Sequence, residues 1–475
     1  MKDSENHWDV VVVGAGLAGM MAANCAARDG ATVCVLEQGE GEHYPCNTRY
    51  SGGLFHIALD DLAGEPEVVL SNLHRAMHGE FDTDLAEALI ENAPAAIRTL
   101  KDFGVRFISA GYDGFRRHSL APPIVRRPGL HWRGRAGDVM LETLERSLTN
   151  VGAQLRRGVT AEQLMMNAET GRCVGVQARH INGPETYHAG SVILADGGFQ
   201  ADSQLVADYI SPAPHRLVQR NAESGRGSSV RMAASVSARL VGMESFYGHL
   251  LHRDAFHNER LWPYPVLDAV ATAGIVVDGA GSRYCDEGKG GVYIANQTAR
   301  LRDPASIFVV FDEAIWSNAG RSGLLPANPY VVDAGGSLIR ADSIGSLATK
   351  MAMHPDILHR TITNYNESLA AFEPSIGSPS RSTDRYRAEP IKGPTYYAFP
   401  ACAGITYTTG GLAINAYAQV LHENGAVIGG LYACGACTGG LEGGRWAGYT
   451  GGLTKAATFG LIAGRSALSD LRTTA

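Results

Sequence analysis

The chain opens with an apolar run that ends in a group of glycines. Residues 9–13 are almost all β-branched, which is typical of a strand buried on both faces. Gly14-Ala15-Gly16-Leu17-Ala18-Gly19 follows, and alanines then recur through residue 27 at helical spacing. A second apolar run at residues 32–36 ends at Glu37. The pattern predicts a strand, a tight turn, a closely packed helix and a second strand.

Each glycine in this turn has a physical reason. Gly14 permits the tight turn, Gly16 lets the backbone approach a pyrophosphate, and Gly19 lets the helix pack against the sheet. The start of the helix attracts phosphate charge. Glu37 lies 23 residues after Gly14, where an acid accepts hydrogen bonds from ribose hydroxyls. These residues predict a dinucleotide site but do not separate NAD from FAD.

Two later segments have the pattern of further strands in the same sheet. Residues 191–195 form a buried run that leads into Asp196-Gly197, and residues 430–435 read as strand and turn near the end of the chain. Gly451-Gly452-Leu453 then begins an alanine-rich helix. A long cofactor needs contacts beyond one βαβ unit, and these segments are placed to supply them.

Composition narrows the possible partners. The chain has 475 residues, enough for two domains, and 45% of them are hydrophobic. Its net charge of −7 argues against nucleic acid, because no basic excess is available to neutralise phosphates. No secretory signal and no integral membrane segment is expected. The eight cysteines are scattered, so reduced thiols and a cytoplasmic location are predicted.

Several motifs occur in a fixed order along most of the chain. They are Asn47-Thr48-Arg49-Tyr50-Ser51-Gly52-Gly53, residues 192–199 (VILADGGF), Gly225-Arg226-Gly227, residues 238–244 (ARLVGME), residues 281–287 (GSRYCDE), residues 394–398 (PTYYA) and residues 404–412 (GITYTTGGL). In this respect the sequence resembles the fumarate reductase/succinate dehydrogenase flavoprotein superfamily. It looks closest to the tricarballylate dehydrogenase branch, with the 3-ketosteroid dehydrogenases as a second relative.

The resemblance implies an α/β protein that binds FAD. A Rossmann-type FAD-binding domain would comprise residues 1–244 and 404–475, and an inserted α+β capping domain would comprise residues 245–403. The cofactor would be bound without a covalent link, because Cys46 and Asn47, and not a histidine, stand where some relatives attach flavin through a histidine; a link through Cys46 stays an alternative. The residues expected to contact FAD are Gly14, Ala15, Gly16, Gly19, Glu37, Gln38, Thr48, Arg49, Ser51, Gly52, Gly53, Val159, Ala195, Asp196, Gly197, Gly435, Gly451, Gly452 and Leu453.

The resemblance also implies a reaction at a carbon–carbon bond next to a carbonyl or carboxylate, in either direction. His249 and Arg445 match substrate-binding positions and are expected to polarise the acceptor oxygen. Tyr407 or Tyr449 is expected to move the proton, with a pKa lowered by neighbouring cations. Other cationic positions of the family are absent, so the site is better suited to one carboxylate or carbonyl on an apolar or ring-shaped body. A small-molecule substrate and an unidentified electron acceptor follow.

Other interpretations of the same residues stay open. An amine or hydroxy-compound oxidase similar to L-aspartate oxidase, or a subunit that mainly transfers electrons, fits the same architecture. Cys434 and Cys437 form a CxxC pattern, but their position in a strand-to-turn segment favours small buried thiols. The spacing of His249, His252 and His257 shows no helical register, so no metal site is predicted.

Overall fold

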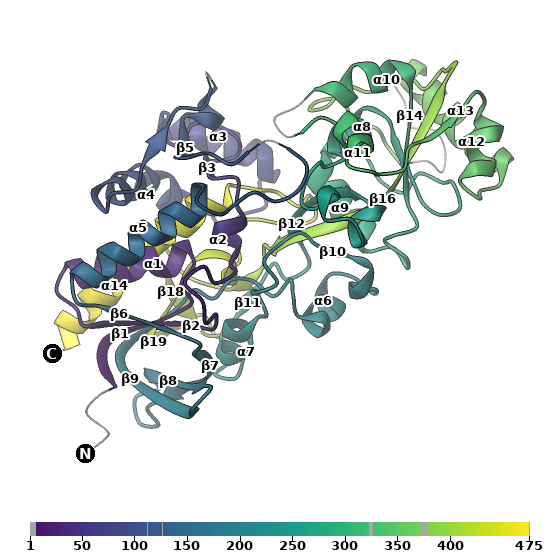
Figure 1. Cartoon of the computed structure of the whole chain (residues 1–475). Helices are drawn as coiled ribbons and strands as arrows, with labels where there is room; N and C mark the ends of the chain where they lie inside the picture. Colours follow the sequence, from purple (N-terminus) through teal and green to yellow (C-terminus); the bar gives the residue numbers. More distant parts are fainter. Residues whose placement is uncertain (1–5, 112, 126, 323–325, 372–378, 475) are drawn as a thin grey trace.

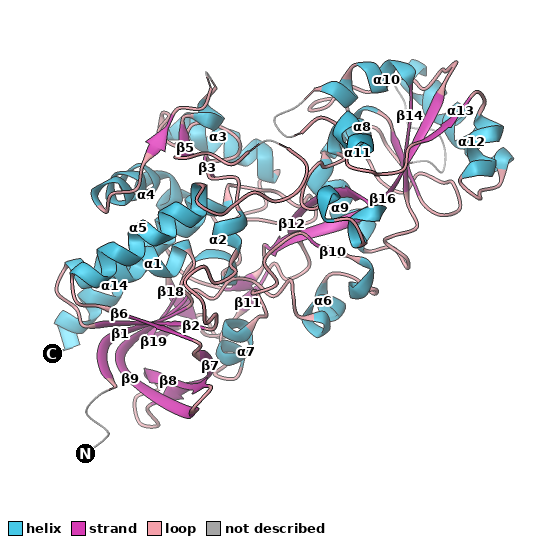
Figure 2. Cartoon of the chain, viewed as in Figure 1, coloured by secondary structure: helices cyan, strands magenta, loops and turns pink. Residues whose placement is uncertain are grey.

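The structure, a computed structural model, describes residues 6–111, 113–125, 127–322, 326–371 and 379–474 (Figure 1). Two sheets lie in different parts of the molecule, each with its own hydrophobic core. Both ends of the chain lie beside the first sheet, and the second sheet is built mostly from the middle of the chain (Figures 1 and 2).

The first sheet has eight strands, and its core order is β18-β19-β9-β1-β2-β6. All pairs from β19 to β6 along this order are parallel. The strand near the C-terminus therefore extends the sheet that the N-terminal strand begins, as the sequence predicts. The strands are β1 (His7–Val13), β2 (Val33–Glu37), β6 (Gln154–Arg157), β7 (Thr160–Met166), β8 (Cys173–His180), β9 (Gly183–Leu194), β18 (Gln419–Leu421) and β19 (Val427–Ala433).

Helices cover one face of this sheet (Figure 2). A Cβ on Gly460 would lie 2.5 Å from the carbonyl oxygen of Ala18, and a Cβ on Gly464 would lie as close to that of Ala22. These small residues let the first and last helices of the chain pack against each other, which fixes both chain ends on one face. The helices here are α1 (Leu17–Arg28), α3 (Pro66–Met77), α4 (Thr83–Asp102), α5 (Ala136–Asn150) and α14 (Gly452–Thr474).

The second sheet has six strands, in the order β10-β16-β14-β13, with β12 and β15 also paired to β16. It is mainly antiparallel, with helices around it, which is an α+β arrangement. The strands are β10 (Val218–Gln219), β12 (Phe246–His252), β13 (Ile275–Val277), β14 (Phe308–Asp312), β15 (Ile339–Ala341) and β16 (Tyr396–Thr408). The helices are α8 (Asp268–Ala273), α9 (Gly291–Ala299), α10 (Glu313–Ser317), α11 (Pro329–Asp333), α12 (Ile344–Lys350) and α13 (Pro355–Ala371).

Shorter elements join the two parts. They are α2 (Asn47–Tyr50), a three-stranded sheet of β3 (Leu54–Phe55), β4 (Phe107–Ile108) and β5 (His118–Leu120), α6 (Ser203–Tyr209), α7 (Ser228–Ala234), and the pair β11 (Leu240–Val241) with β17 (Gly411–Leu412). The second core already includes Phe199 and Val218, and β16 crosses position 404. The domain boundaries near residues 244 and 404 therefore stay a prediction.

Two further findings concern the whole described chain. Within the described ranges, no helix has the length and apolar character needed to cross a membrane. All eight cysteines are buried, and none forms a disulfide. The Sγ of Cys437 donates to the carbonyl oxygens of Leu194 and Cys434, as expected of a packed thiol.

Candidate functional site

A cavity of about 670 Å³ extends from the N-terminal glycine turn to the junction of β12 and β16. Its wall takes residues from the ends of β1, β9 and β19, from the segment around α2, and from the middle of the chain. One continuous space therefore connects the predicted nucleotide end with a second end lined by aromatic and ionisable side chains.

The nucleotide end is made largely of backbone. Gly14 has φ +98° and donates its N–H to the carbonyl of Leu36, and a Cβ there would lie 2.6 Å from the carbonyl oxygen of Ala195. A Cβ on Gly19 would collide with the carbonyl oxygen of Gly14. Gly16 caps α1, and Leu17 and Ala18 at the start of this helix line the cavity, where the helix N-terminus suits a phosphate; the Leu17 N–H donates to the Thr48 hydroxyl at 3.0 Å. Gly14 and Gly19 thus form the tight turn and the close helix packing that the sequence predicts.

Acidic groups at this end fit a ligand that carries hydroxyls. The carboxylate of Glu37 accepts hydrogen bonds from the N–H groups of Ala15 at 3.0 Å and Gly39 at 2.8 Å. Asp196 accepts from the N–H of Ser229, but its buried Oδ1 has no partner among the described residues. Burial raises the pKa of Asp196 to about 6. An unpaired acceptor in the wall of the cavity fits a hydroxyl of a dinucleotide.

Most of the predicted FAD contacts line the cavity, and three do not. Gly19 lies behind the turn, where it packs α1 against the strand. Gly451 donates its N–H to Glu442, and a Cβ there would collide with the carbonyl oxygen of His56. Arg49 points away from the cavity. Those that line it are Gly14, Ala15, Gly16, Glu37, Gln38, Thr48, Ser51, Gly52, Gly53, Val159, Ala195, Asp196, Gly197, Gly435, Gly452 and Leu453.

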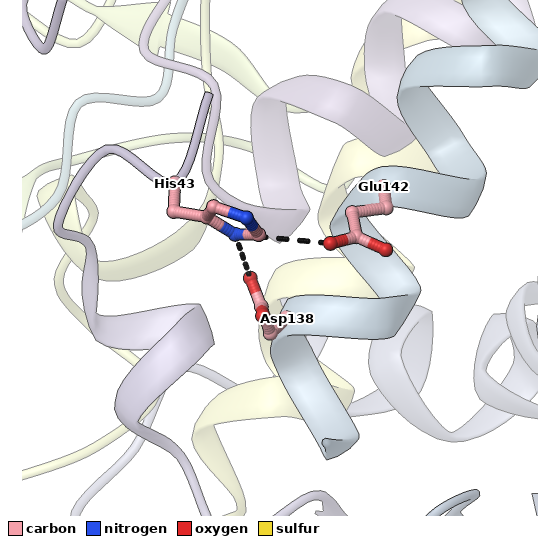
Figure 3. Close-up of side chains that lie close together, drawn as sticks. All are labelled: His43, Asp138 and Glu142. Carbon is pink, nitrogen blue, oxygen red and sulfur yellow. Dashed lines mark hydrogen bonds and ion pairs between the residues drawn. The ribbon is translucent and has the colours of Figure 1, made fainter. Parts of the chain in front are cut away.

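Arg49 belongs to a separate cluster with His43, Asp138 and Glu142 (Figure 3). His43 Nδ1 lies 3.1 Å from Asp138 and 3.7 Å from Glu142. The buried Arg49 guanidinium already pairs with Asp138, and the N–H of Gly134 bonds its other oxygen. The pKa of Asp138 is lowered by these bonds in spite of burial. A metal ion would compete with Arg49, so the cluster is best described as an ion-pair network.

The far end of the cavity brings together three of the four predicted reacting residues. Tyr247 on β12 lies opposite Tyr407 on β16 in the strand register, and its ring stacks on that of Tyr449 at 4.0 Å. The Tyr449 hydroxyl accepts from the N–H of Gly452 at 3.3 Å. His249 Nε2 lies 3.0 Å from the Tyr247 hydroxyl, and His249 Nδ1 lies 2.5 Å from Asp268. Tyr247, His249 and Asp268 thus form one hydrogen-bonded chain, and Tyr449 stacks on the tyrosine at its end.

The pKa direction at the tyrosines is opposite to the prediction. Burial raises the pKa of Tyr247 and, to well above its usual value, that of Tyr449. Burial and the Glu442 carboxylate also raise the pKa of Tyr407 well above its usual value. Arg220 opposes this effect at Tyr247 but does not reverse it. The cations that the sequence reasoning expected to stabilise a tyrosinate are outweighed by desolvation.

Tyr407 is held by a second buried network. Its hydroxyl donates to Glu442 at 3.1 Å, and the hydroxyl of Thr450 donates to the same carboxylate at 2.6 Å. Lys455 pairs with Glu442 at 3.4 Å and donates to the carbonyl of Thr438 at 2.9 Å. Glu442 and Lys455 are both almost fully buried. The network fixes the position of Tyr407 beside the start of α14.

Arg445 is not brought to this end of the cavity. Its side chain is 74% exposed and pairs with Glu80 at 2.6 Å, and its guanidinium lies over the Trp446 ring. His249 also differs from its expected role, because both ring nitrogens are engaged within the chain of hydrogen bonds. Neither residue is placed to polarise the acceptor oxygen directly.

Sequence reasoning missed several residues of this end: Arg220, Tyr247, Asp268, Glu442 and Lys455. One signal was available, because Tyr247 and His249 are two residues apart, and residues at that spacing share a face in a strand such as β12. Asp268 meets His249 only because α8 begins beside β12, which no local pattern indicates.

The comparisons with known proteins agree with this geometry. The family described as an FAD binding domain matches residues 9–448. The chain is 26% identical to an NADH:fumarate oxidoreductase of Klebsiella pneumoniae (strain 342), covering 98% of this chain and 48% of that protein. It is 25% identical to a vinyl phenol reductase of Lactiplantibacillus plantarum, covering 92% of this chain and 91% of that protein. The chain thus spans about half the length of the first relative.

A solved structure shares the fold. The 3-ketosteroid-Δ4-(5α)-dehydrogenase of Rhodococcus jostii RHA1, in complex with 4-androstene-3,17-dione, superposes with a TM-score of 0.72 at 22% identity, covering 98% of this chain and 97% of that one. The α/β fold with a capping region is therefore confirmed, and FAD is the cofactor. The chain belongs to the FAD binding domain family, within the fumarate reductase/succinate dehydrogenase flavoprotein superfamily.

Proposed function

We propose that the protein is an FAD-dependent oxidoreductase that dehydrogenates, or in reverse reduces, a carbon–carbon bond next to a carbonyl or carboxylate. The observation that carries the proposal is the single cavity that joins the nucleotide end to Tyr449 and to the hydrogen-bonded chain from Tyr247 to Asp268. Reactions of this class need a hydride carrier and a proton path within one space. The reductases among the relatives support the same class of reaction.

The direction of the hydrogen bonds suits removal of a proton from the substrate. Asp268 holds the His249 proton on Nδ1, which leaves Nε2 to accept from the Tyr247 hydroxyl. Tyr449, whose ring stacks on that of Tyr247 at 4.0 Å, would in turn donate its hydroxyl proton to the Tyr247 oxygen. A proton taken by the Tyr449 oxygen is therefore passed along to His249, whose imidazolium Asp268 stabilises. The raised pKa values of both tyrosines favour this transfer over a free tyrosinate.

FAD is held in this proposal by the glycine turn, Asp196 and the start of α14, with no covalent link. When bound, it supplies or accepts the hydride. Cys46 lines the cavity, but burial raises the pKa of its thiol to about 12, so it is a weak nucleophile at neutral pH. Acid precipitation should accordingly release all the flavin from the protein.

The remaining assignments are proposals too. Residues 1–244 and 404–475 would form the FAD-binding domain, and residues 245–403 the capping domain. The substrate would be a small molecule, and electrons would pass to an acceptor outside this chain. A cytoplasmic location fits the eight unpaired thiols.

The test is anaerobic mixing of the FAD-loaded protein with saturated carboxylic acids and cyclic ketones, followed at the flavin absorbance. We expect bleaching with at least one member, and reoxidation of the reduced protein by the matching unsaturated compound. Hydrogen peroxide release with an amine or hydroxy compound, and no bleaching by the panel, would instead identify an oxidase.

A further inference from the structure

Arg220 is a buried cation at the reacting end of the cavity. It follows β10, and its backbone N–H donates to the carbonyl of Ile405. Its Nε donates to the carbonyl of Pro263 at 3.0 Å, and its Nη1 donates to the Thr406 hydroxyl at 2.8 Å. The guanidinium also lies 4.8 Å from the centre of the Tyr264 ring. Two segments of the chain, at residues 263–264 and 405–406, therefore hold this side chain in one orientation.

The charge of Arg220 has no carboxylate partner among the described residues. The other buried arginine and lysine side chains each have one: Arg49 pairs with Asp138, Arg283 with Glu287, and Lys455 with Glu442. A buried cation without a counter-ion is unfavourable, and proteins ordinarily compensate it. Among these buried cations, Arg220 alone lacks a carboxylate partner, and it is also the one arginine in the described wall of the cavity.

The surroundings of Arg220 indicate what kind of anion would complete it. A guanidinium has five N–H donors, and two of those of Arg220 have side-chain or carbonyl partners among the described residues. Asp268, a carboxylate in the wall of the same cavity, already pairs with His249. The neighbouring wall is mostly aromatic or apolar, with Trp262, Pro263 and Tyr264. One guanidinium beside an apolar wall matches a ligand that has a single planar anionic group, such as a carboxylate, on an apolar body.

We infer that Arg220 binds a carboxylate group of the substrate and so makes the protein selective for monocarboxylic acids with an apolar or cyclic body. The inference rests on the proposed function and names its substrate class. Arg220 lies close enough to Tyr247 for its charge to oppose the rise in the pKa of that phenol. A carboxylate bound there places the adjacent α-carbon beside the tyrosines that receive its proton.

The test compares two probes with the same ring, cyclohexanecarboxylate and its methyl ester. Each is titrated into FAD-loaded protein, and binding is followed by the change in the flavin absorbance spectrum, which does not require turnover. Wild-type protein should prefer the acid. Arg220→Gln should weaken acid binding by about 10- to 100-fold, the range for a lost hydrogen bond to a charged group, and leave ester binding unchanged. The affinity of Arg220→Lys for the acid should lie between that of wild-type protein and that of Arg220→Gln.

Arg226→Gln is the matched control, because Arg226 is an exposed arginine of the same segment. It should leave the acid preference intact. FAD content and the unfolding temperature of each variant report whether the fold survives. An unchanged acid preference in Arg220→Gln overturns the inference, as does wild-type protein that binds neither probe or prefers the ester.

Two further outcomes separate this inference from others. Loss of FAD from Arg220→Gln, with the acid preference retained when FAD is in excess, would show that the guanidinium serves the cofactor and would also overturn the inference. Because the proposed function is judged by flavin reduction and this inference by acid-over-ester binding, one can fail while the other holds.

Discussion

The two ends of the cavity are built in different ways. At the nucleotide end the wall is largely backbone, since Gly14 and Gly16 shape the turn and the start of α1 lines the space. At the reacting end it consists of side chains from β12, β16, α8 and the segment before α14, joined in two buried hydrogen-bond networks. The first end depends on short contiguous sequence, and the second depends on long-range packing. The two ends should therefore fail differently when single residues are changed.

The largest effect is expected from Gly14→Ala. The added Cβ would lie 2.6 Å from backbone atoms of Ala195 and Asp196, and the residue needs φ +98°. Backbone atoms cannot move aside as the end of a flexible side chain can, so the turn should change its conformation. The purified protein should then contain less flavin. The ratio of flavin absorbance to protein absorbance measures this directly.

Gly30→Ala is the control for backbone strain alone. Gly30 also has a positive φ, +103°, but nothing lies within 4 Å of an added Cβ. It should cost about 1 kcal/mol of stability and retain FAD. Equal flavin content in the two variants would contradict the role given to the Gly14 turn.

At the reacting end, Tyr247→Phe and Tyr449→Phe should retain FAD but slow its reduction. Each change removes a hydroxyl from the proposed proton path that ends at Asp268, and general acid–base groups typically contribute about 10²- to 10⁴-fold. Stopped-flow reduction by a substrate that bleaches the wild-type flavin gives the rate. The loss should be smaller in Tyr407→Phe, because the Tyr407 hydroxyl donates to Glu442 and lies outside this path.

These variants also test the original choice between two tyrosines. If the rate of flavin reduction is unchanged in Tyr407→Phe, in Tyr449→Phe and in the double variant, neither Tyr407 nor Tyr449 takes part in the proton transfer. Unchanged reduction in Tyr247→Phe alone, with a loss in Tyr449→Phe, would make Tyr449 the base without the relay behind it.

The contrast between the two ends also explains what the sequence predicts. The βαβ unit and the joining of both chain ends in one sheet follow from local patterns, because apolar runs, glycines and an acid have fixed spacing there. Most of the residues that the family resemblance predicts as FAD contacts line the cavity. His249, Tyr407 and Tyr449 were found through family motifs. Arg445 was assigned to the reacting end because its position matches a family motif, but a sequence match does not say where a side chain points. The Arg445 side chain is exposed and pairs with Glu80. Arg220 and Asp268 come to the cavity through tertiary packing alone.

A third prediction concerns the buried pair behind Tyr407. Glu442→Gln removes the counter-ion of Lys455, which is only 2% exposed. Leaving one buried charge unpaired typically costs about 3–5 kcal/mol. The free energy of unfolding, measured in urea, should therefore fall by about 3 kcal/mol. The double variant Glu442→Gln/Lys455→Met should recover part of the loss. A single variant as stable as wild type would show that water reaches Lys455.

The smallest effect is a pH dependence at His56, between the two ends. Its ring is buried and Nδ1 accepts from the N–H of Leu59, and burial lowers the pKa of His56 to about 3. The unfolded chain has a histidine pKa near 6.5, so between these values the unfolded state binds the extra proton. The contribution of neutral His56 to stability is therefore complete above about pH 6.5 and falls as the pH drops toward 3.

His56→Asn isolates this contribution, because the Asn side-chain oxygen can still accept from Leu59 and does not titrate. On lowering the pH from 7 to 5 at saturating FAD, wild type should lose about 2 kcal/mol more unfolding free energy than the variant. Asp196, whose pKa of about 6 is raised by burial, has the opposite sign in this window but is present in both proteins. Equal losses in the two proteins would mean that His56 stays accessible to protons in the folded state.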